Sequence, residues 1–118
     1  MSKVTGVALV ASCPCVDELI NGEFVIVSDP VAEIQVWLKD HCHGAALLEV
    51  SDRAGGSKHP QFELWCAGVN YMNVEDEFAA FVMSRRWGAP ETVILMLQPE
   101  EGVTRVFRPP YDEDGWMK

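Results

Sequence analysis

Two cysteines and a later cluster of histidines are the residues in this chain best suited to metal chemistry. Cys13 and Cys15 flank a proline, and the run His41-Cys42-His43 follows further along the chain. Two thiolates and two imidazoles would suit a tetrahedral zinc ion, but the common zinc motifs use different spacings. On a helix, His41 and His43 would point about 200° apart. We therefore predict no metal and no cofactor, and keep Cys13, Cys15, His41 and His43 as the alternative ligand set.

A catalytic cysteine is the second chemistry that these residue types permit. Cys13 or Cys15 would be the nucleophile, and a histidine would be the base. A position near a helix start would lower the pKa of Cys15. The sequence places no histidine beside either thiol and contains no oxyanion-hole motif. We predict that the protein is not an enzyme, with a small metal- or thiol-dependent enzyme that uses Cys13 and Cys15 as the alternative.

Charge gives a different indication of function. The 118 residues include 18 acids and 9 bases, for a net charge of −9. That balance opposes direct nucleic-acid binding, which needs clustered Lys and Arg. It permits docking on a basic surface of a partner protein, although acidic surfaces also serve solubility. The residues predicted to bind a partner are the acidic and exposed aromatic ones: Glu75, Asp76, Glu77, Glu100, Glu101, Tyr71 and Trp116.

The acids at 75–77 belong to the clearest unit of the sequence, residues 61–87. An apolar, aromatic-rich strand over 61–69 leads into a helix that we expect Asn73 to cap. The acids lie at the positive helix end, and Arg85-Arg86 lie near the negative end. Gly88 then Pro90 end the helix. The helix is expected to bury one stripe of side chains. This stripe consists of Phe78, Phe81, Val82 and Arg85, and it is widened by Ala79, Met83 and Trp87.

The remaining elements are a helix over 30–43, which Asp29 caps, and strands over 4–11, 24–28, 45–51, 92–98 and 103–108. The run over 92–98 is almost continuously apolar, as expected of a strand that is covered on both faces. Asn21-Gly22 is a hairpin signal. Because Asp17-Glu18 would interrupt a strand, we favour a helical turn over residues 14–21.

From residue 24 onward the order is β-α-β-β-α-β, which predicts a ferredoxin-like α+β fold. We expect a mostly antiparallel sheet with two helices on one face and an extra strand at each end. Residues 1–108 would form a single domain, followed by an acidic C-terminal tail over 109–118. No apolar run approaches the ~20 residues that span a bilayer. We therefore expect a cytoplasmic protein that does not bind membranes.

Residues 61–87 resemble short uncharacterised proteins of tailed bacteriophages, in which an aromatic strand leads into an acidic helix with a closing Arg-Trp pair. Here these features are residues 62–65, 73–78, Phe81 and Arg86-Trp87. The small size and acidic charge are also similar to anti-CRISPR and other host-takeover proteins, by analogy rather than by motif. The resemblance implies a phage-encoded protein in the host cytoplasm that binds and inhibits a host protein, such as CRISPR machinery. A homodimeric structural or accessory phage protein, paired through an edge strand, is a further alternative.

Overall fold

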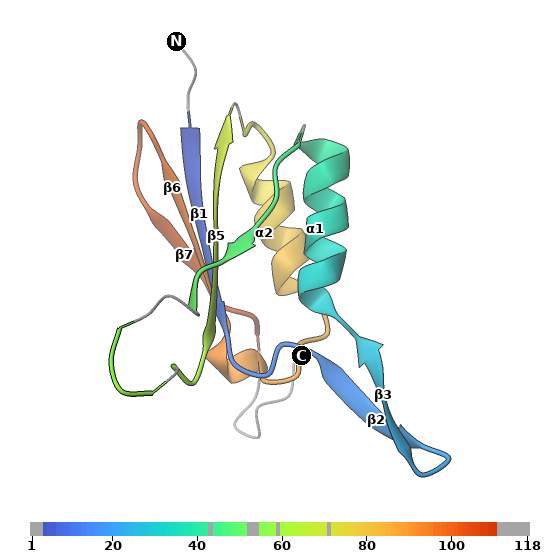
Figure 1. Cartoon of the computed structure of the whole chain (residues 1–118). Helices are drawn as coiled ribbons and strands as arrows, with labels where there is room; N and C mark the ends of the chain where they lie inside the picture. The colour runs from blue at the N-terminus through green and yellow to red at the C-terminus, as the bar shows by residue number, and fades with distance from the viewer. Residues whose placement is uncertain (1–3, 43, 52–54, 59, 71, 111–118) are drawn as a thin grey trace.

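The computed structural model describes residues 4–42, 44–51, 55–58, 60–70 and 72–110 (Figure 1). Its strands are β1 (Val4–Ala11), β2 (Val16–Ile20), β3 (Glu23–Ser28), β4 (Leu48–Glu49), β5 (Glu63–Asn70), β6 (Ile94–Pro99) and β7 (Arg105–Phe107). Its helices are α1 (Pro30–His41) and α2 (Glu75–Met83), with a short 3₁₀ helix at Pro90–Thr92. The predicted α+β class is confirmed.

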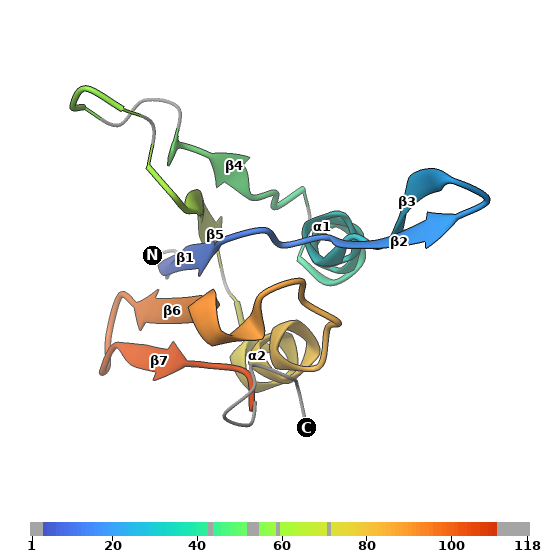
Figure 2. The same ribbon diagram turned by 90° about the horizontal axis from the view of Figure 1, so that it is seen from below.

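Five strands form one antiparallel sheet in the order β4-β5-β1-β6-β7. The central strand, β1, is made of small and β-branched residues that suit a strand between two neighbours. Its Leu9 lies opposite Trp65 of β5 on one side and opposite Leu95 of β6 on the other. Both helices cover the same face of this sheet, as predicted (Figure 2).

The core lies between this face and the helices. α1 begins where Asp29 accepts a hydrogen bond from the Ala32 N–H at 3.2 Å, and Pro30 occupies the first turn. The large apolar side chains with 0% exposure are Leu9, Ile34, Leu38, Phe78, Val82, Val93, Leu95 and Leu97. The Trp87 indole N–H donates to the Val82 carbonyl at 2.9 Å, so this buried ring satisfies its polar atom.

The hairpin signal at Asn21-Gly22 is correct, and the favoured helical turn over 14–21 is wrong. β2 and β3 form a separate two-stranded sheet, and the residues between them have positive φ values of 52° at Asn21 and 82° at Gly22. That pair of left-handed residues matches the twist of a tight hairpin. Asp17 and Glu18 do not interrupt β2, because this hairpin extends away from the body and leaves both side chains in solvent (Figure 1).

The hairpin also changes the predicted strand order. The strand expected over 24–28 forms, but it lies outside the main sheet. The first strand, expected as an extra strand at one end of the ferredoxin-like core, instead takes the centre of the sheet as β1. Of the extra strands expected at the two ends, β7 at the C-terminal end lies at a sheet edge, beside β6.

Three local predictions are also corrected. Asn73 does not cap α2, whose N-cap position is Val74 and has no side-chain cap. α2 ends at Met83, before Arg85, whose guanidinium reaches across to Glu33 of α1 at 3.0 Å. The strand expected over 45–51 shortens to β4 because the Gln35 side chain takes both backbone groups of Leu47, at 2.7 and 2.8 Å.

The remaining predictions concern coverage and extent. β6 is covered by helices on one face only, and its Ile94 is 36% exposed. Residues 111–118 of the expected tail lie outside the described residues. Among the residues that the structure describes, neither helix has the length and apolar character needed to cross a membrane.

Candidate functional site

The acids predicted to bind a partner come together at one end of the molecule. The start of α2 and the turn between β6 and β7 lie side by side at this end, at the top of Figure 1. Glu75, Glu100 and Glu101 line a groove of about 430 Å³ there. Glu75, Asp76 and Glu77 line an adjoining hollow of about 390 Å³. These five residues are called the acidic end.

Two of the five carboxylates also make contacts with side chains of the sheet. The Thr5 hydroxyl of β1 donates a hydrogen bond to Glu75 at 2.7 Å, which ties the start of α2 to the sheet. Arg105 of β7 lies 2.6 Å from Asp76, but Asp76 is 81% exposed, so this ion pair is worth little to stability. The hydrogen bond to Thr5 therefore gives Glu75 a structural role, and the exposed ion pair with Arg105 gives Asp76 a weaker one.

The other carboxylates give the acidic end its electrostatic character. Glu77, Glu100 and Glu101 are exposed. Arg105 is the one basic side chain among the described residues that line the two hollows. A surface with this excess of negative charge attracts cationic partners over roughly a Debye length, ~8 Å at physiological salt. The two aromatic anchors predicted beside the acids, Tyr71 and Trp116, lie outside the described residues.

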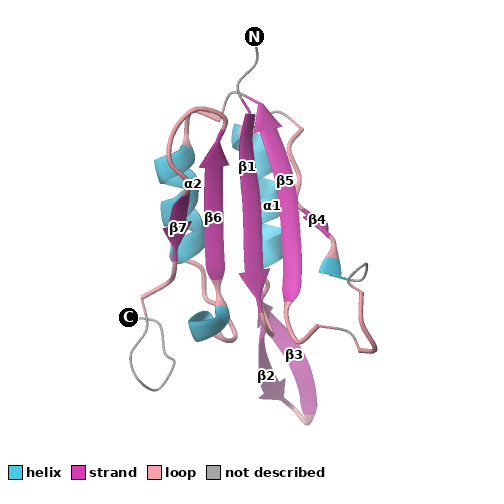
Figure 3. Ribbon diagram, turned by 90° about the vertical axis from the view of Figure 1, so that its left-hand side faces the viewer, coloured by secondary structure: helices cyan, strands magenta, loops and turns pink. Residues whose placement is uncertain are grey.

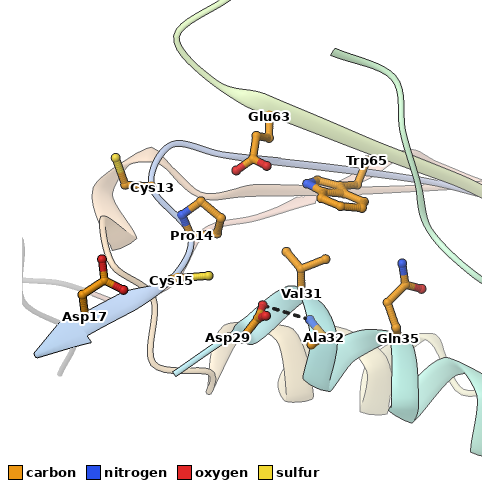
Figure 4. A pocket seen from close by; sticks show the side chains of 10 residues that line it. All are labelled: Cys13, Pro14, Cys15, Asp17, Asp29, Val31, Ala32, Gln35, Glu63 and Trp65. Atoms are coloured by element: carbon orange, nitrogen blue, oxygen red, sulfur yellow. Dashed lines mark hydrogen bonds between the residues drawn. The ribbon is translucent and has the colours of Figure 1, made fainter. Parts of the chain in front are cut away.

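The predicted cysteine chemistry falls at the opposite end of the sheet. Cys13 and Cys15 line a pocket of about 580 Å³ together with Trp65 and Val31 (Figure 4). Three acidic residues also line it: Asp17, Asp29 and Glu63. The Cys15 sulfur points into the pocket, whereas the Cys13 sulfur points away from it (Figure 4). The pocket lies at the start of α1, where Asp29 forms the N-cap.

The surroundings of Cys15 oppose its use as a nucleophile. Burial raises the pKa of the Cys15 thiol above its ordinary value of 9.0, and the negative charge of Asp29, with which the thiol hydrogen-bonds, raises it further. Asp17 and Glu63 act in the same direction. The predicted pKa lowering by the helix start is therefore wrong, because burial and the nearby carboxylates raise the pKa of this thiol. The thiol stays protonated near neutral pH.

The Cys13-Pro14-Cys15 segment has a clear structural role. The Gly88 N–H donates to the Pro14 carbonyl at 3.0 Å. A Cβ on Gly88 would lie 2.2 Å from the carbonyl oxygens of both Cys13 and Cys15, so only glycine fits beneath this loop. Cys13 itself has a φ of 47°, in the left-handed region. The segment forms the tight turn that leads from β1 into the hairpin.

The alternative metal ligands do not meet. His41 is the last residue of α1, a helix about 18 Å long, whereas Cys15 lines the pocket at the start of that helix. His41 stacks on Trp37 with ring centroids 4.1 Å apart, and His43 lies outside the described residues. Within the described residues, no group of three or more His, Cys, Asp and Glu side chains is arranged to hold a metal ion.

The hairpin is a feature that sequence reasoning missed. One of its faces carries Leu19, Phe24 and Ile26, which are 63%, 78% and 60% exposed. It is joined to the body by the Ser28 hydroxyl, which donates to the Arg86 carbonyl at 2.8 Å, and by an Arg86–Glu18 pair at 3.4 Å. The Asn21-Gly22 pair, followed by the apolar and largely β-branched run over 24–27, was the signal that could have found it.

Comparisons of the chain with protein-family models, with curated proteins and with solved structures find no match. Function is therefore inferred from the residues and their geometry.

Proposed function

We propose that this is a small non-enzymatic binding protein that docks its acidic end on a basic surface of a partner protein. One observation carries the proposal. Two acidic segments that are separate in the sequence, 75–77 and 100–101, lie around adjoining hollows at one end of the fold. Glu77 and Glu100 are exposed to solvent and add to this negative charge, which favours a cationic partner.

A basic groove that binds nucleic acid is the partner surface that fits best. Proteins that bind a phosphate backbone present clustered Lys and Arg along a groove. A rigid set of carboxylates would occupy such a groove and exclude the nucleic acid. We therefore propose that the protein is a phage-encoded inhibitor, which acts in the host cytoplasm on a nucleic-acid-binding defence complex.

We also propose that the scaffold is a variant of the ferredoxin-like fold. The order β6-β1-β5-β4, with α1 after β1 and α2 after β5, supports this assignment. In this description β1 is the first strand, and the β2–β3 hairpin is an insertion between β1 and α1. The alternative of a thiol-dependent enzyme is less well supported because the raised pKa of Cys15 opposes thiolate formation.

The test compares two triple charge reversals in capture from a host lysate, with bound proteins identified by mass spectrometry. Glu77→Lys, Glu100→Lys and Glu101→Lys together alter the acidic end. Glu23→Lys, Asp40→Lys and Glu91→Lys make the same change in net charge at exposed positions elsewhere. We expect the first variant to lose a captured nucleic-acid-binding protein, with at least about tenfold weaker binding, and the second to retain it.

Salt dependence is the second measurement. Capture by the unaltered protein should weaken steeply as sodium chloride rises from low to high concentration, because exposed charges are screened. A complex that is insensitive to salt, or one that both triple variants weaken equally, would contradict the proposal.

A further inference from the structure

The face of the five-stranded sheet opposite the helices is apolar, and none of the described residues covers it (Figure 3). It is called the bare face. In β1, alternate residues such as Thr5, Val7 and Leu9 are buried under the helices, so the residues between them point to the bare face. Together with the residues that pair with them on the other strands, the bare face consists of Val4, Gly6, Ala8, Val10, Leu48, Leu64, Cys66, Gly68, Asn70, Ile94, Met96, Gln98 and Val106.

Strand register joins these side chains into rows across the sheet. One row runs through all five strands as Leu48, Cys66, Ala8, Met96 and Val106. Its two ends are strongly exposed, with Leu48 at 69% and Val106 at 62%. Such a continuous apolar patch on a folded protein marks an interaction surface.

The bare face differs from the rest of the molecule in charge. Its described strand residues include no Asp, Glu, Lys or Arg, and its polar side chains are the amides of Asn70 and Gln98. The whole chain has a net charge of −9. Contact between two copies through an acidic surface would therefore be repulsive, whereas contact through the bare face buries no like charges.

The size of the face is sufficient for a specific interface. The strands β1 and β5 have 8 residues each, β6 has 6, β7 has 3 and β4 has 2. At ~3.3 Å per residue and ~4.8 Å between strands, they give a patch of roughly 400 Å² per copy in projection. Because side-chain surface exceeds projected area, two such patches would bury about 1,000 Å² or more, the lower limit for a specific protein interface. The sequence of β6 fits this burial, since Ile94 and Met96 are as apolar as Leu95 and Leu97 on the covered face.

We propose that the bare face packs against the bare face of a second copy of this chain, as a two-fold dimer with the helices outside. This is the sheet-on-sheet packing of a β-sandwich, with the two layers ~10 Å apart. It differs from the edge-strand dimer that the sequence offered as an alternative, and it leaves the acidic end of each copy free to bind a partner.

Sedimentation velocity of the full chain tests the dimer. We expect a mass of twice 13.1 kDa at about 100 µM protein, corresponding to a dissociation constant in the micromolar range or below. Leu48→Asp with Val106→Asp places carboxylates at both ends of the row, where the side chains are exposed enough for the fold to tolerate them. This double variant should dissociate at least about tenfold more readily.

A matched control makes the same chemical change elsewhere. Phe24→Asp with Val36→Asp alters one exposed residue of the hairpin and one of α1, which are 78% and 60% exposed. This control should remain dimeric. An unaltered chain that is monomeric at about 100 µM, or a control that dissociates as much as the bare-face variant, would overturn the proposal.

Cysteine alkylation, followed by mass spectrometry, provides a second measurement that does not depend on mass. Cys66 lies in the middle of the bare face, whereas Cys42 is buried in the core on the covered side. We expect Cys66 to react more slowly in the unaltered dimer than in the Leu48→Asp, Val106→Asp variant, with Cys42 unchanged. Equal labelling of Cys66 in the two proteins would contradict a dimer through this face.

Discussion

The two faces of the central strand are equally apolar but differ in what lies against them. On the covered face, β1 presents Val7 and Leu9 to the helices, at 3% and 0% exposure. On the bare face it presents Gly6, Ala8 and Val10, which stay half-buried at most through their strand neighbours. The larger side chains thus lie where two layers interdigitate, and the smaller ones form a flatter surface. Apolar character therefore does not distinguish a core from an interface, whereas side-chain size and the opposite layer do.

The largest expected difference between the faces is in core truncation. Leu9→Ala on the covered face should lower the free energy of unfolding by about 3 kcal/mol, because it leaves a cavity among fully buried neighbours. Val10→Ala, the adjacent residue on the bare face, should cost about 1 kcal/mol or less. Urea denaturation at a protein concentration low enough to be monomeric measures both. Equal losses at the two positions would remove the distinction between the faces.

Glycines sharpen the same comparison. Gly88→Ala should destabilise the protein by about 2 kcal/mol, because the new Cβ would overlap two carbonyl oxygens of the Cys13-Pro14-Cys15 turn. On the bare face, a Cβ at Gly68 would meet Val4 at 3.7 Å, an ordinary contact. Gly68→Ala should therefore leave the monomer unchanged or stabilise it by about 0.5 kcal/mol, through the entropy of the unfolded chain. Thermal unfolding of dilute samples checks the pair. A tolerated alanine at position 88 would show that the turn moves freely.

The smallest expected effect is a pH dependence of stability that arises from the Cys15 thiol. Burial and Asp29 raise the pKa of Cys15 above 9.0 in the folded protein, so the unfolded chain ionises first as pH rises. The resulting contribution to stability is complete below pH 9.0 and is lost as pH rises above it. The unaltered protein should therefore lose more stability between pH 8 and pH 10.5 than Cys15→Ser does. Parallel stability curves for the two proteins would argue against a buried, acid-flanked thiol.

Local signals in the sequence predicted the elements with strong boundaries. Asp29-Pro30 set the start of α1, and the small β-branched run over 4–11 gave β1. The acids later found at the acidic end were also recognisable, because charge is visible without knowledge of the fold. That 75–77 and 100–101 lie together could not be predicted, since it depends on which strand neighbours which.

The errors arose where tertiary context overrides a local pattern. Asp17-Glu18 argued against a strand only on the assumption that the strand lies in a sheet that a helix covers. In a hairpin that extends into solvent, those charges cost little, and Asn21-Gly22 decides the structure. The apolar run of β6 predicted cover on two faces without indicating whether this chain or another supplies the second layer.

The central position of β1 has a consequence for how the chain folds. Its Leu9 lies opposite Trp65 on one side and Leu95 on the other, so both pairings join residues that are far apart in the chain. α1 and the β2–β3 hairpin depend on nearby residues and can form early, whereas the sheet requires the closure of long loops. We therefore expect slow folding for a domain of this size, with one edge of β1 open to aggregation until β6 pairs with it.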